Sequence, residues 1–335
     1  MSSPDAADTS SLRLALTALV PNEFGGERLD RTAAALFDEY SRTELTRWIR
    51  AGELRVNGGV AAAKKRLLGG ERLDLTGRVR ELPAWQTPQP VEFGVLHEDE
   101  DLIVVAKPVG LVVHPGAGQP AGTLVNGLLH RFPQLKHLPR AGIVHRLDKD
   151  TSGALAVAAS PAAHRTLVQA LAERRVERRY RAIAIGRIDA DRRIEAPIGR
   201  DPSRRTRQAV VAHGKPAVTH VRVLERFAAH SLIEARLETG RTHQIRVHLA
   251  HVGHPLVGDA RYGARLRLPA ACDAALESAL RAFEHQALHA WRLGLTHPRT
   301  GQWLEFEAAE PDDFRALVNA LRHHADPDTR SGAGQ

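Results

Sequence analysis

The segment of the chain richest in reactive side chains is the hexapeptide His145–Asp150, which reads His-Arg-Leu-Asp-Lys-Asp. An apolar run leads into it, and Ser152-Gly153 then turns into the strand-like run Ala154–Ala159. Charged residues held between two core segments are typical of a pocket, because loops on a rigid sheet often carry function. A surface turn with incidental ion pairs fits the same pattern, so the pattern alone leaves both interpretations open.

The carboxylate of Asp148 is the central candidate for chemistry in this segment. A carboxylate can act as a nucleophile only while it is ionised. Burial disfavours the charged form, whereas a neighbouring guanidinium favours it. The adjacent Lys149 and Asp150 are expected to form a structural ion pair that supports the loop.

Two other groups of residues could suggest a metal or a cofactor. The histidines His243, His248, His251 and His254 are clustered, but their spacing is not that of His-Glu-x-x-His, and no cysteine lies near them. We therefore expect no metal, and we interpret His248 and His251 as core residues or as residues that face a bound partner. The glycines of the segment 116–118 lack the spacing of a dinucleotide fingerprint, so this segment is interpreted as a loop. No cofactor is expected.

Size, cysteine content and charge limit the class of protein. The chain has 335 residues, 43% of them hydrophobic, which suffices for one large core or two unequal ones. The single cysteine, Cys272, excludes an internal disulfide and favours a reducing compartment. No signal peptide and no apolar run of about 20 residues is present, so we expect a soluble cytoplasmic protein that does not associate with a membrane. The net charge of +8 favours a nucleic-acid partner, although arginine enrichment in a GC-rich genome is an alternative.

The elements that must position Asp148 belong to a long region from about Val91 to Leu321. Several strand-like runs follow one another there without a helix between them, which predicts a mixed, largely antiparallel sheet and an α+β fold. Strands are predicted at Leu102–Ala106, Leu111–His114, Ala154–Ala159, Tyr180–Ile185, Val218–Phe227, Ser231–Glu238 and Leu304–Ala308. Helices are predicted at Thr123–Arg131, Ala162–Glu173, Thr242–Ala250 and Asp312–His323.

A smaller unit precedes this region. Leu12–Val20 alternates as a strand, Asp30 is a candidate cap for a helix through Ala33–Phe37, and Ser41 for a second helix, Thr43–Ala51, that Gly52 ends. Asn57-Gly58 is then a hairpin turn between two short strands. Two helices followed by a Val-Asn-Gly hairpin resemble the S4 RNA-binding domain. The expected organisation is a disordered tail over 1–10, the S4-like domain over 11–76, a Pro-rich linker over 77–92, the α+β domain over 93–322 and a disordered tail over 323–335.

The S4 resemblance implies that basic side chains of the small unit bind RNA phosphates. Arg47 and Arg50 lie on the second predicted helix, and Lys64 and Lys65 follow the hairpin. The alternative is a solvated basic face on a small structural module.

The complete string His145–Gly153 resembles the catalytic motif of the RluA family of pseudouridine synthases. The other motifs of that family follow in order: Glu177–Ala182 resembles its tyrosine motif, Glu238–His248 its third motif, and His254–Asp259 with Tyr262-Gly263 the segments after it. Arg178-Arg179 makes the tyrosine motif more basic than is usual, which would strengthen RNA contact. The resemblance covers roughly residues 12–322.

This resemblance implies a role for each matching residue. Asp148 matches the catalytic aspartate, which either attacks the sugar C1′ or removes a sugar proton while the glycosidic bond breaks. Tyr180 matches the tyrosine that packs on the uracil, and Arg246 matches the basic partner of the aspartate. The residues expected to contact RNA around the pocket are Arg146, His145 and Arg241.

The resemblance also implies the substrate. It is tightest to members with an S4-like domain that act on large-subunit ribosomal RNA. The predicted targets are uridines in the helix 69 stem-loop, either in 23S rRNA or in a pre-ribosomal 50S particle. The enzyme is expected to be a monomer. Two alternatives stay open. One is a family member that acts on another rRNA or tRNA site, and the other is a non-catalytic ribosome-assembly factor that binds RNA.

Overall fold

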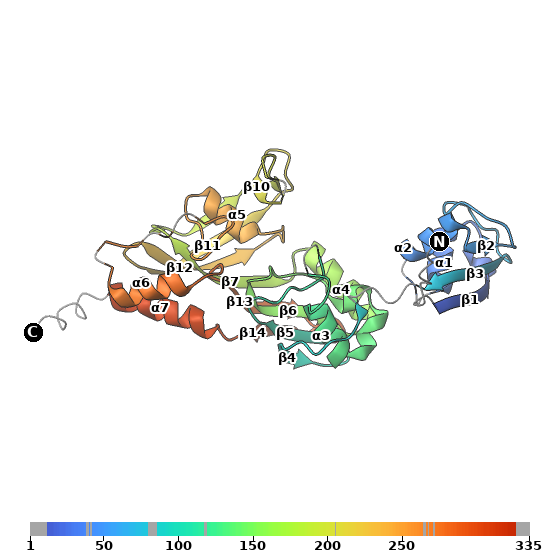
Figure 1. Cartoon of the computed structure of the whole chain (residues 1–335), viewed down its shortest axis with the longest axis horizontal. Helices are drawn as coiled ribbons and strands as arrows, with labels where there is room; N and C mark the ends of the chain where they lie inside the picture. Colours follow the sequence, from blue (N-terminus) through green and yellow to red (C-terminus); the bar gives the residue numbers. More distant parts are fainter. Residues whose placement is uncertain are drawn as a thin grey trace, which may run out of the picture. The chain divides into compact units, whose positions relative to one another are not determined.

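A computed structural model describes residues 12–37, 40, 42–79, 86–116, 119–204, 206–263, 266, 268–270 and 272–325 (Figure 1). The chain divides into two compact units, Met1–Thr87 and Pro88–Gln335. None of the helices in these described ranges is both long enough and apolar enough to cross a membrane.

The first unit is a three-stranded antiparallel sheet with two helices. The sheet order is β1 (Leu12–Leu19), β3 (Arg72–Val79), β2 (Leu54–Val56), and the helices are α1 (Leu29–Leu36) and α2 (Arg42–Ala51). Both helices bury apolar side chains against the sheet in one shared core, in which Trp48 is fully buried. The short 3-10 helix η1 (Asn22–Phe24) connects β1 to α1.

Two local predictions in this unit are wrong. Asp30 does not cap α1, whose N-cap is Arg28; its buried carboxylate pairs instead with Arg28 at 2.9 Å and Arg42 at 2.6 Å. The turn at Asn57-Gly58 forms, but it closes on an isolated bridge rather than a second hairpin strand, and β2 pairs with β3. Ser41, predicted to cap α2, lies outside the described residues.

The second unit is built on a nine-stranded sheet. Its order is β4-β5-β6-β13-β7-β12-β11-β8, with β14 paired to β13. Of the strand pairs in the described part of this sheet, β6 with β13 is parallel and the others are antiparallel, which confirms the predicted mixed, largely antiparallel α+β fold. The strands are β4 (Gly94–Glu98), β5 (Leu102–Lys107), β6 (Ser152–Ala158), β7 (Glu177–Ile185), β8 (Arg192–Glu195), β11 (Val218–Arg226), β12 (His230–Leu237), β13 (Leu288–Thr296) and β14 (Trp303–Glu307). A separate two-stranded sheet pairs β9 (Ile198–Arg200) with β10 (Gln208–Val210).

Helices cover this sheet over two separate cores. Helix α4 (Pro161–Ala172) shares an apolar core with β5, β6 and β13, whereas α6 (Ala274–Ala282) and α7 (Asp312–Ala325) share one with β7 and β12. The remaining helical segments are α3 (Leu124–Arg131), α5 (Gln244–His251), and the 3-10 helices η3 (Pro133–His137) and η4 (Pro139–Gly142). The predicted α3, α4, α5 and α7 are confirmed to within a few residues.

Three predictions for this unit need correction. Leu111–His114 is not a strand, because its backbone carbonyls accept hydrogen bonds from the first N–H groups of α3. The predicted tail 323–335 begins inside α7, which continues to Ala325. Gln89, placed in the predicted linker, instead bonds to Gly122 and Asn126 of the second unit. Ala117 and Gly118 of the predicted glycine loop, and the tail segments 1–10 and 326–335, lie outside the described residues.

The join between β6 and β13 lies beside the Asp148 loop. Gly153 has φ +115° there, and a Cβ on it would lie only 2.2 Å from the backbone oxygen of Ala290. Only glycine therefore permits the two strands to approach at this point. The approach fixes where the loop enters the sheet.

Candidate active site

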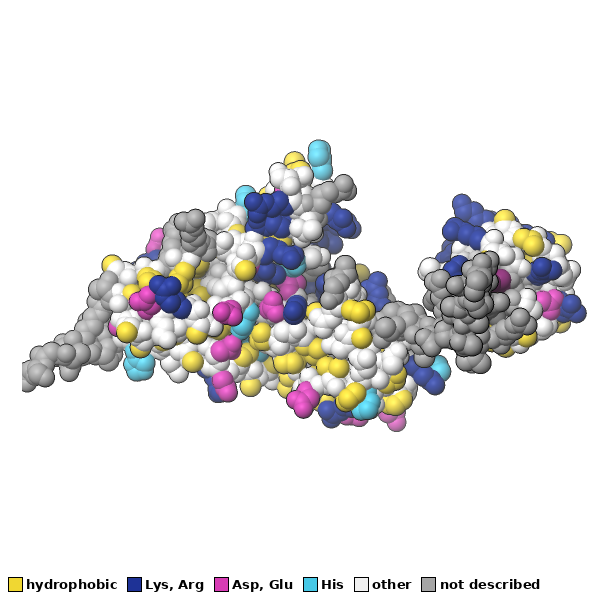
Figure 2. Space-filling model, in the orientation of Figure 1, with side chains coloured by type: hydrophobic (Ala, Val, Ile, Leu, Met, Phe, Trp, Pro, Cys, Tyr) yellow, Lys and Arg dark blue, Asp and Glu magenta, His cyan; other side chains and the backbone are white. Residues whose placement is uncertain are grey.

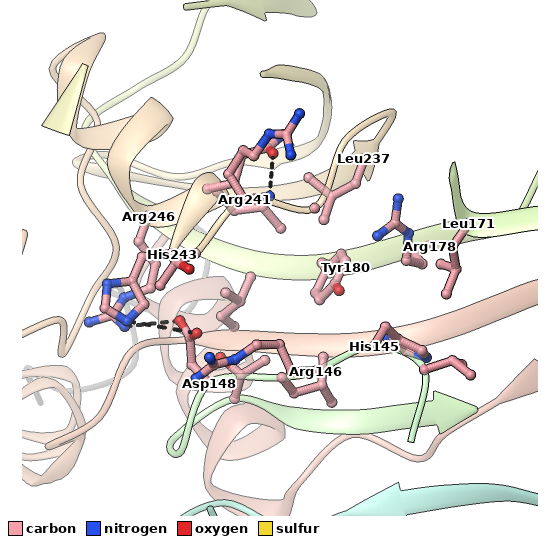
Figure 3. A pocket seen from close by; sticks show the side chains of 18 of the residues that line it. His145, Arg146, Asp148, Leu171, Arg178, Tyr180, Leu237, Arg241, His243 and Arg246 are labelled. Atoms are coloured by element: carbon pink, nitrogen blue, oxygen red, sulfur yellow. Dashed lines mark hydrogen bonds and ion pairs between the residues drawn. The ribbon is translucent and has the colours of Figure 1, made fainter. Parts of the chain in front are cut away.

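A pocket of about 660 Å³ opens in the second unit (Figure 3). It lies between the loop before β6, strand β7 and the turn before α5. Five arginines and a single carboxylate line it, so the pocket suits an anionic ligand. Figure 2 shows further Lys and Arg side chains gathered around α5 and β10. The charged lining residues are Arg140, Arg146, Asp148, Arg178, Arg241 and Arg246.

Asp148 and Arg246 meet in this pocket although 98 positions separate them in the chain. The Arg246 Nη1 group donates to Asp148 Oδ2 at 3.0 Å, as drawn in Figure 3. The side chain of Asp148 is 17% exposed and that of Arg246 is 8% exposed. The guanidinium and the carboxylate therefore face each other in a site from which much of the water is excluded.

A second carboxylate, Asp259, holds the other edge of the Arg246 guanidinium. Arg246 Nε and Nη2 donate to the two oxygens of Asp259 at 2.7 and 2.8 Å. Burial alone would lower the pKa of Arg246, but the hydrogen bonds and charge of Asp259, together with Asp148, hold it above its ordinary value. Burial likewise acts to raise the pKa of Asp259, and Arg246 overcomes this and lowers it. Both groups stay charged.

His243 is the other neighbour of Asp148. It occupies the N-cap of α5 with φ +56°, and its Nε2 lies 3.8 Å from Asp148 Oδ1. The Tyr262 hydroxyl accepts a hydrogen bond from the backbone N–H of Gln208 and lies 2.7 Å from His243 Nδ1. The contact with Tyr262 engages Nδ1 and leaves Nε2 as the ring nitrogen that faces Asp148. Burial, the largest effect, lowers the pKa of His243, and the charge of Asp148 opposes it.

Tyr180 and Arg178 face the pocket from β7. The two are separated by one residue, so their side chains project from the same face of the strand. Tyr180 is 6% exposed and Arg178 is 8% exposed. Burial raises the pKa of Tyr180, with Arg178 acting to lower it and Asp148 to raise it, so both charges lie within electrostatic reach of the phenol.

Buried contacts hold the loop that carries Asp148. His145 Nε2 accepts a hydrogen bond from the backbone N–H of Ala156, and burial lowers the pKa of His145 to about 3. The buried Lys107 ammonium donates to the backbone oxygen of Lys149 at 2.8 Å. The predicted ion pair between Lys149 and Asp150 is wrong, because the loop is held through the Lys149 backbone instead.

Comparison with known proteins identifies the family. The sequence profile of the family described as RNA pseudouridylate synthase matches residues 101–251. "Ribosomal large subunit pseudouridine synthase D" of Vibrio parahaemolyticus is 47% identical over 311 residues, which cover 92% of this chain and 95% of that protein. The protein of the same name from Pseudomonas aeruginosa is 49% identical over 303 residues, covering 90% of this chain and 94% of that one. The chain belongs to the RluA family of pseudouridine synthases.

Solved structures support the same family for the second unit of this synthase. "Human RNA Pseudouridylate Synthase Domain Containing 4" superposes with a TM-score of 0.54 at 26% identity, covering 68% of this chain and 93% of that chain. "Human RNA Pseudouridylate Synthase Domain Containing 1" superposes with a TM-score of 0.52 at 28% identity, covering 72% of this chain and 98% of that chain. As a family member, this synthase is an isomerase.

The residues predicted as functional fall into two groups in the structure of the synthase. The pocket brings together six of them, and four lie exposed in the first unit. His145 is the one whose ring nitrogen is already engaged by the backbone of β6. The pocket group is Asp148, Tyr180, Arg246, Arg146, His145 and Arg241, and the first-unit group is Arg47, Arg50, Lys64 and Lys65.

The clustered histidines lie in different environments in the structure. No group of three metal-ligating side chains occurs in the described residues. His248 is fully buried and bonds to Thr219 and to the backbone oxygen of Ala196, as expected of a core residue. His243 instead faces the catalytic candidate Asp148.

Sequence reasoning missed the roles of Asp259, His243, Tyr262 and Arg178. All four lie inside motifs that the family resemblance had marked, but a motif does not show which side chains turn toward the pocket. Only the long-range pairing of Arg246 with Asp259 reveals that a second carboxylate is needed.

Proposed function

We propose that this synthase converts uridine to pseudouridine in large-subunit ribosomal RNA, in the helix 69 stem-loop, with Asp148 as its catalytic carboxylate. The contact of Asp148 with Arg246 in a pocket lined by arginines carries the proposal. Relatives named for the large ribosomal subunit match over nine-tenths of the chain, which supports the choice of RNA. The helix 69 target rests on the likeness to synthase D.

The target uridine must leave its stack to reach Asp148. Flipping a nucleotide costs a few kcal/mol, and stacking on an aromatic ring returns roughly 1–3 kcal/mol per base. Tyr180 is the aromatic side chain that faces the pocket from β7, so the flipped uracil lies against it. Arg146 is exposed at the pocket mouth, where it reaches the displaced RNA backbone.

Asp148 then acts on the sugar while the C1′–N1 bond breaks, either by bonding to C1′ or by removing a sugar proton. Arg246 donates a hydrogen bond to this carboxylate, and Asp259 keeps Arg246 in place. The uracil rotates and its C5 bonds to C1′ as the bond from Asp148 to C1′ breaks or, on the other route, as the sugar proton is returned. C5 then loses a proton and N1 gains one. Reactant and product are isomers, so the reaction needs no redox partner and no group donor.

The first unit supplies a separate RNA contact in this proposal. Arg47, Arg50, Lys64 and Lys65 are exposed on and after α2. Their charges bind phosphates without reading sequence. Arg241 and His145 contribute at the pocket itself.

The catalytic proposal is tested on RNA that carries tritium at C5 of uridine. Asp148→Asn should abolish tritium release while RNA affinity stays within a fewfold of the parent. Asp189→Asn is the control, because it removes an exposed carboxylate that does not line the pocket. Full activity of Asp148→Asn would exclude the mechanism and would favour a non-catalytic RNA-binding role for this site.

The target is tested in cells. Carbodiimide mapping of ribosomal RNA from a deletion strain should lose the pseudouridine signals of helix 69, and complementation with the parent gene should restore them. Persistence of those signals, with loss of others in rRNA or tRNA, would assign the enzyme to a different RNA site.

A further inference from the structure

Arg178 is a buried cation without a hydrogen-bond or ion-pair partner among the residues that the structure describes. It is one of three buried cationic side chains in the described part of the chain. Arg246 pairs with Asp259 and Asp148, and the Lys107 ammonium donates to three backbone oxygens. Arg178 makes no hydrogen bond or ion pair with a described residue, and its Nε is buried without an acceptor. Because an unpaired buried charge is costly, we expect an acceptor from outside the chain to bind Arg178 on the side that lines the pocket.

The neighbouring arginines of β7 show that this lack of a partner is specific. Arg179 and Arg181 project from the opposite face of the strand. Arg179 pairs with Glu177, and Arg181 with Glu310 at 2.7 Å. The strand therefore pairs its outward arginines with carboxylates and leaves the inward one, Arg178, open to the pocket.

Arg178 lies at the opposite end of the pocket from Asp148. In Figure 3, Tyr180 lies between Asp148 and Arg178. A Cβ on Gly240 would lie 2.7 Å from Arg178 Nη1, so the backbone at this glycine packs directly against the guanidinium. A nucleoside with its sugar at Asp148 and its base on Tyr180 extends the far edge of that base toward Arg178.

We propose that Arg178 binds the carbonyl edge of the uracil and stabilises the negative charge that the ring carries once it separates from the sugar. This inference rests on the proposed catalytic function of Asp148. The C1′–N1 bond breaks with its electron pair on the base, where the charge spreads over N1, O2 and O4. That pair is used when C5 bonds to C1′, after which the ring gains a proton at N1 and loses one from C5. A guanidinium in a dry pocket stabilises such a charge far better than water does.

The test compares three variants of the full-length protein on a helix 69 stem-loop RNA. R178M removes the charge and keeps the bulk, R178K keeps the charge, and R179M is the matched control on the opposite face of β7. At saturating RNA, R178M should lower the single-turnover rate about 100- to 1000-fold, the loss typical for a preorganised donor to a developing charge. R178K should stay within about tenfold of the parent, and R179M within about threefold.

Two binding and stability measurements separate this role from others. For R178M, RNA affinity and the slope of log affinity against log salt should match the parent, and the melting temperature should be equal or higher, because a buried unpaired charge is gone. A slope reduced by about 0.7–0.9 with an unchanged saturating rate would assign Arg178 to a phosphate and overturn the proposal. A saturating rate within threefold of the parent would also overturn it.

Two further arms keep the outcome interpretable. If R178M does not fold, R178Q replaces it, since its amide can donate to a carbonyl but carries no charge; a rate within threefold of the parent again overturns the proposal. Failure of the parent itself to modify the stem-loop would refute the proposed target instead, and the same variants would then be compared on whichever uridine RNA the parent modifies.

Discussion

Asp259 binds Arg246 through both Nε and Nη2, which leaves Nη1 as the group that reaches Asp148. The Asp259 side chain is fully buried, and it also accepts hydrogen bonds from the backbone N–H groups of Arg261 and Tyr262. Asp259 is thus a positioning residue. It sets the direction of the guanidinium without facing the pocket.

Asp259→Asn should therefore impair both catalysis and stability. The amide cannot balance the charge of Arg246, and breaking a buried pair from one side costs about 3–5 kcal/mol of unfolding free energy. A guanidinium displaced by about 1 Å should lower the single-turnover rate about 100-fold. Chemical denaturation and single-turnover kinetics measure the two effects, with the exposed Asp313→Asn as control. An unchanged rate in the folded variant would show that Asp148 does not need an oriented Arg246.

His243 and Tyr262 should act as one unit. Because the Tyr262 hydroxyl holds the Nδ1 side of the His243 ring while Nε2 faces Asp148, losing either partner disrupts the same contact with Asp148. Tyr262→Phe and His243→Gln should each lower the rate about tenfold, and the double variant should be little worse than either, a coupling of about 1 kcal/mol. Strictly additive losses in this double-mutant cycle would show that the two residues act independently.

His230 should make folding sensitive to acid. It is buried on β12, and burial, helped by the charge of His324, lowers the pKa of His230 to about 4. The unfolded chain takes up this proton near pH 6.5, so stability that is complete above pH 6.5 is lost as the pH falls toward 4.

The test is His230→Leu, which should reduce the loss of unfolding free energy between pH 7 and pH 4.5 by about 2 kcal/mol relative to the parent. Denaturant titrations at the two pH values measure this difference. The exposed His213→Leu serves as the control and should follow the parent. Parallel stability curves for His230→Leu and the parent would exclude His230 as a source of acid sensitivity.

The first unit should contribute to RNA affinity through charge alone. Replacing Arg47, Arg50, Lys64 and Lys65 together with Gln should reduce the slope of log affinity against log salt by about 3, because each lost phosphate contact removes roughly 0.7–0.9. The rate at saturating RNA should stay near that of the parent, since these side chains belong to the other unit. Filter binding over a salt series tests this, and an unchanged slope would mean that the basic face is merely solvated.

Local signals predicted much of the fold. Thr123 forms a capping box with Asn126 at the start of α3, and the fully buried run that became β6 was continuous and apolar in the sequence. Such elements can be predicted from a few neighbouring residues. Leu111–His114 is similarly apolar, but its backbone carbonyls accept hydrogen bonds from the N-terminus of α3. The sequence of the segment alone does not predict this contact.

Long-range contacts account for what the sequence did not reveal. Strand β13 was not predicted, because its polar residues are not typical of a central strand. His289, for example, is buried there and makes hydrogen bonds with the Ser152 side chain and the backbone oxygen of Ala308. Within the candidate site, motif strings marked Asp148, Tyr180 and Arg246, and the pocket contains all three. The inward direction of Arg178 and the pairing of Asp259 depend on strand orientation and on a helix from a distant part of the chain.

The place of β13 between β6 and β7 has a consequence for synthesis of the chain. Those two strands leave the ribosome more than a hundred residues before residues 288–296, which must later insert between them. Until then both strands present open edges, and the pocket that depends on them is incomplete. We therefore expect a nascent chain to lack activity until residues 288–296 have emerged, and a truncation before residue 288 would remove the middle of the sheet rather than its rim.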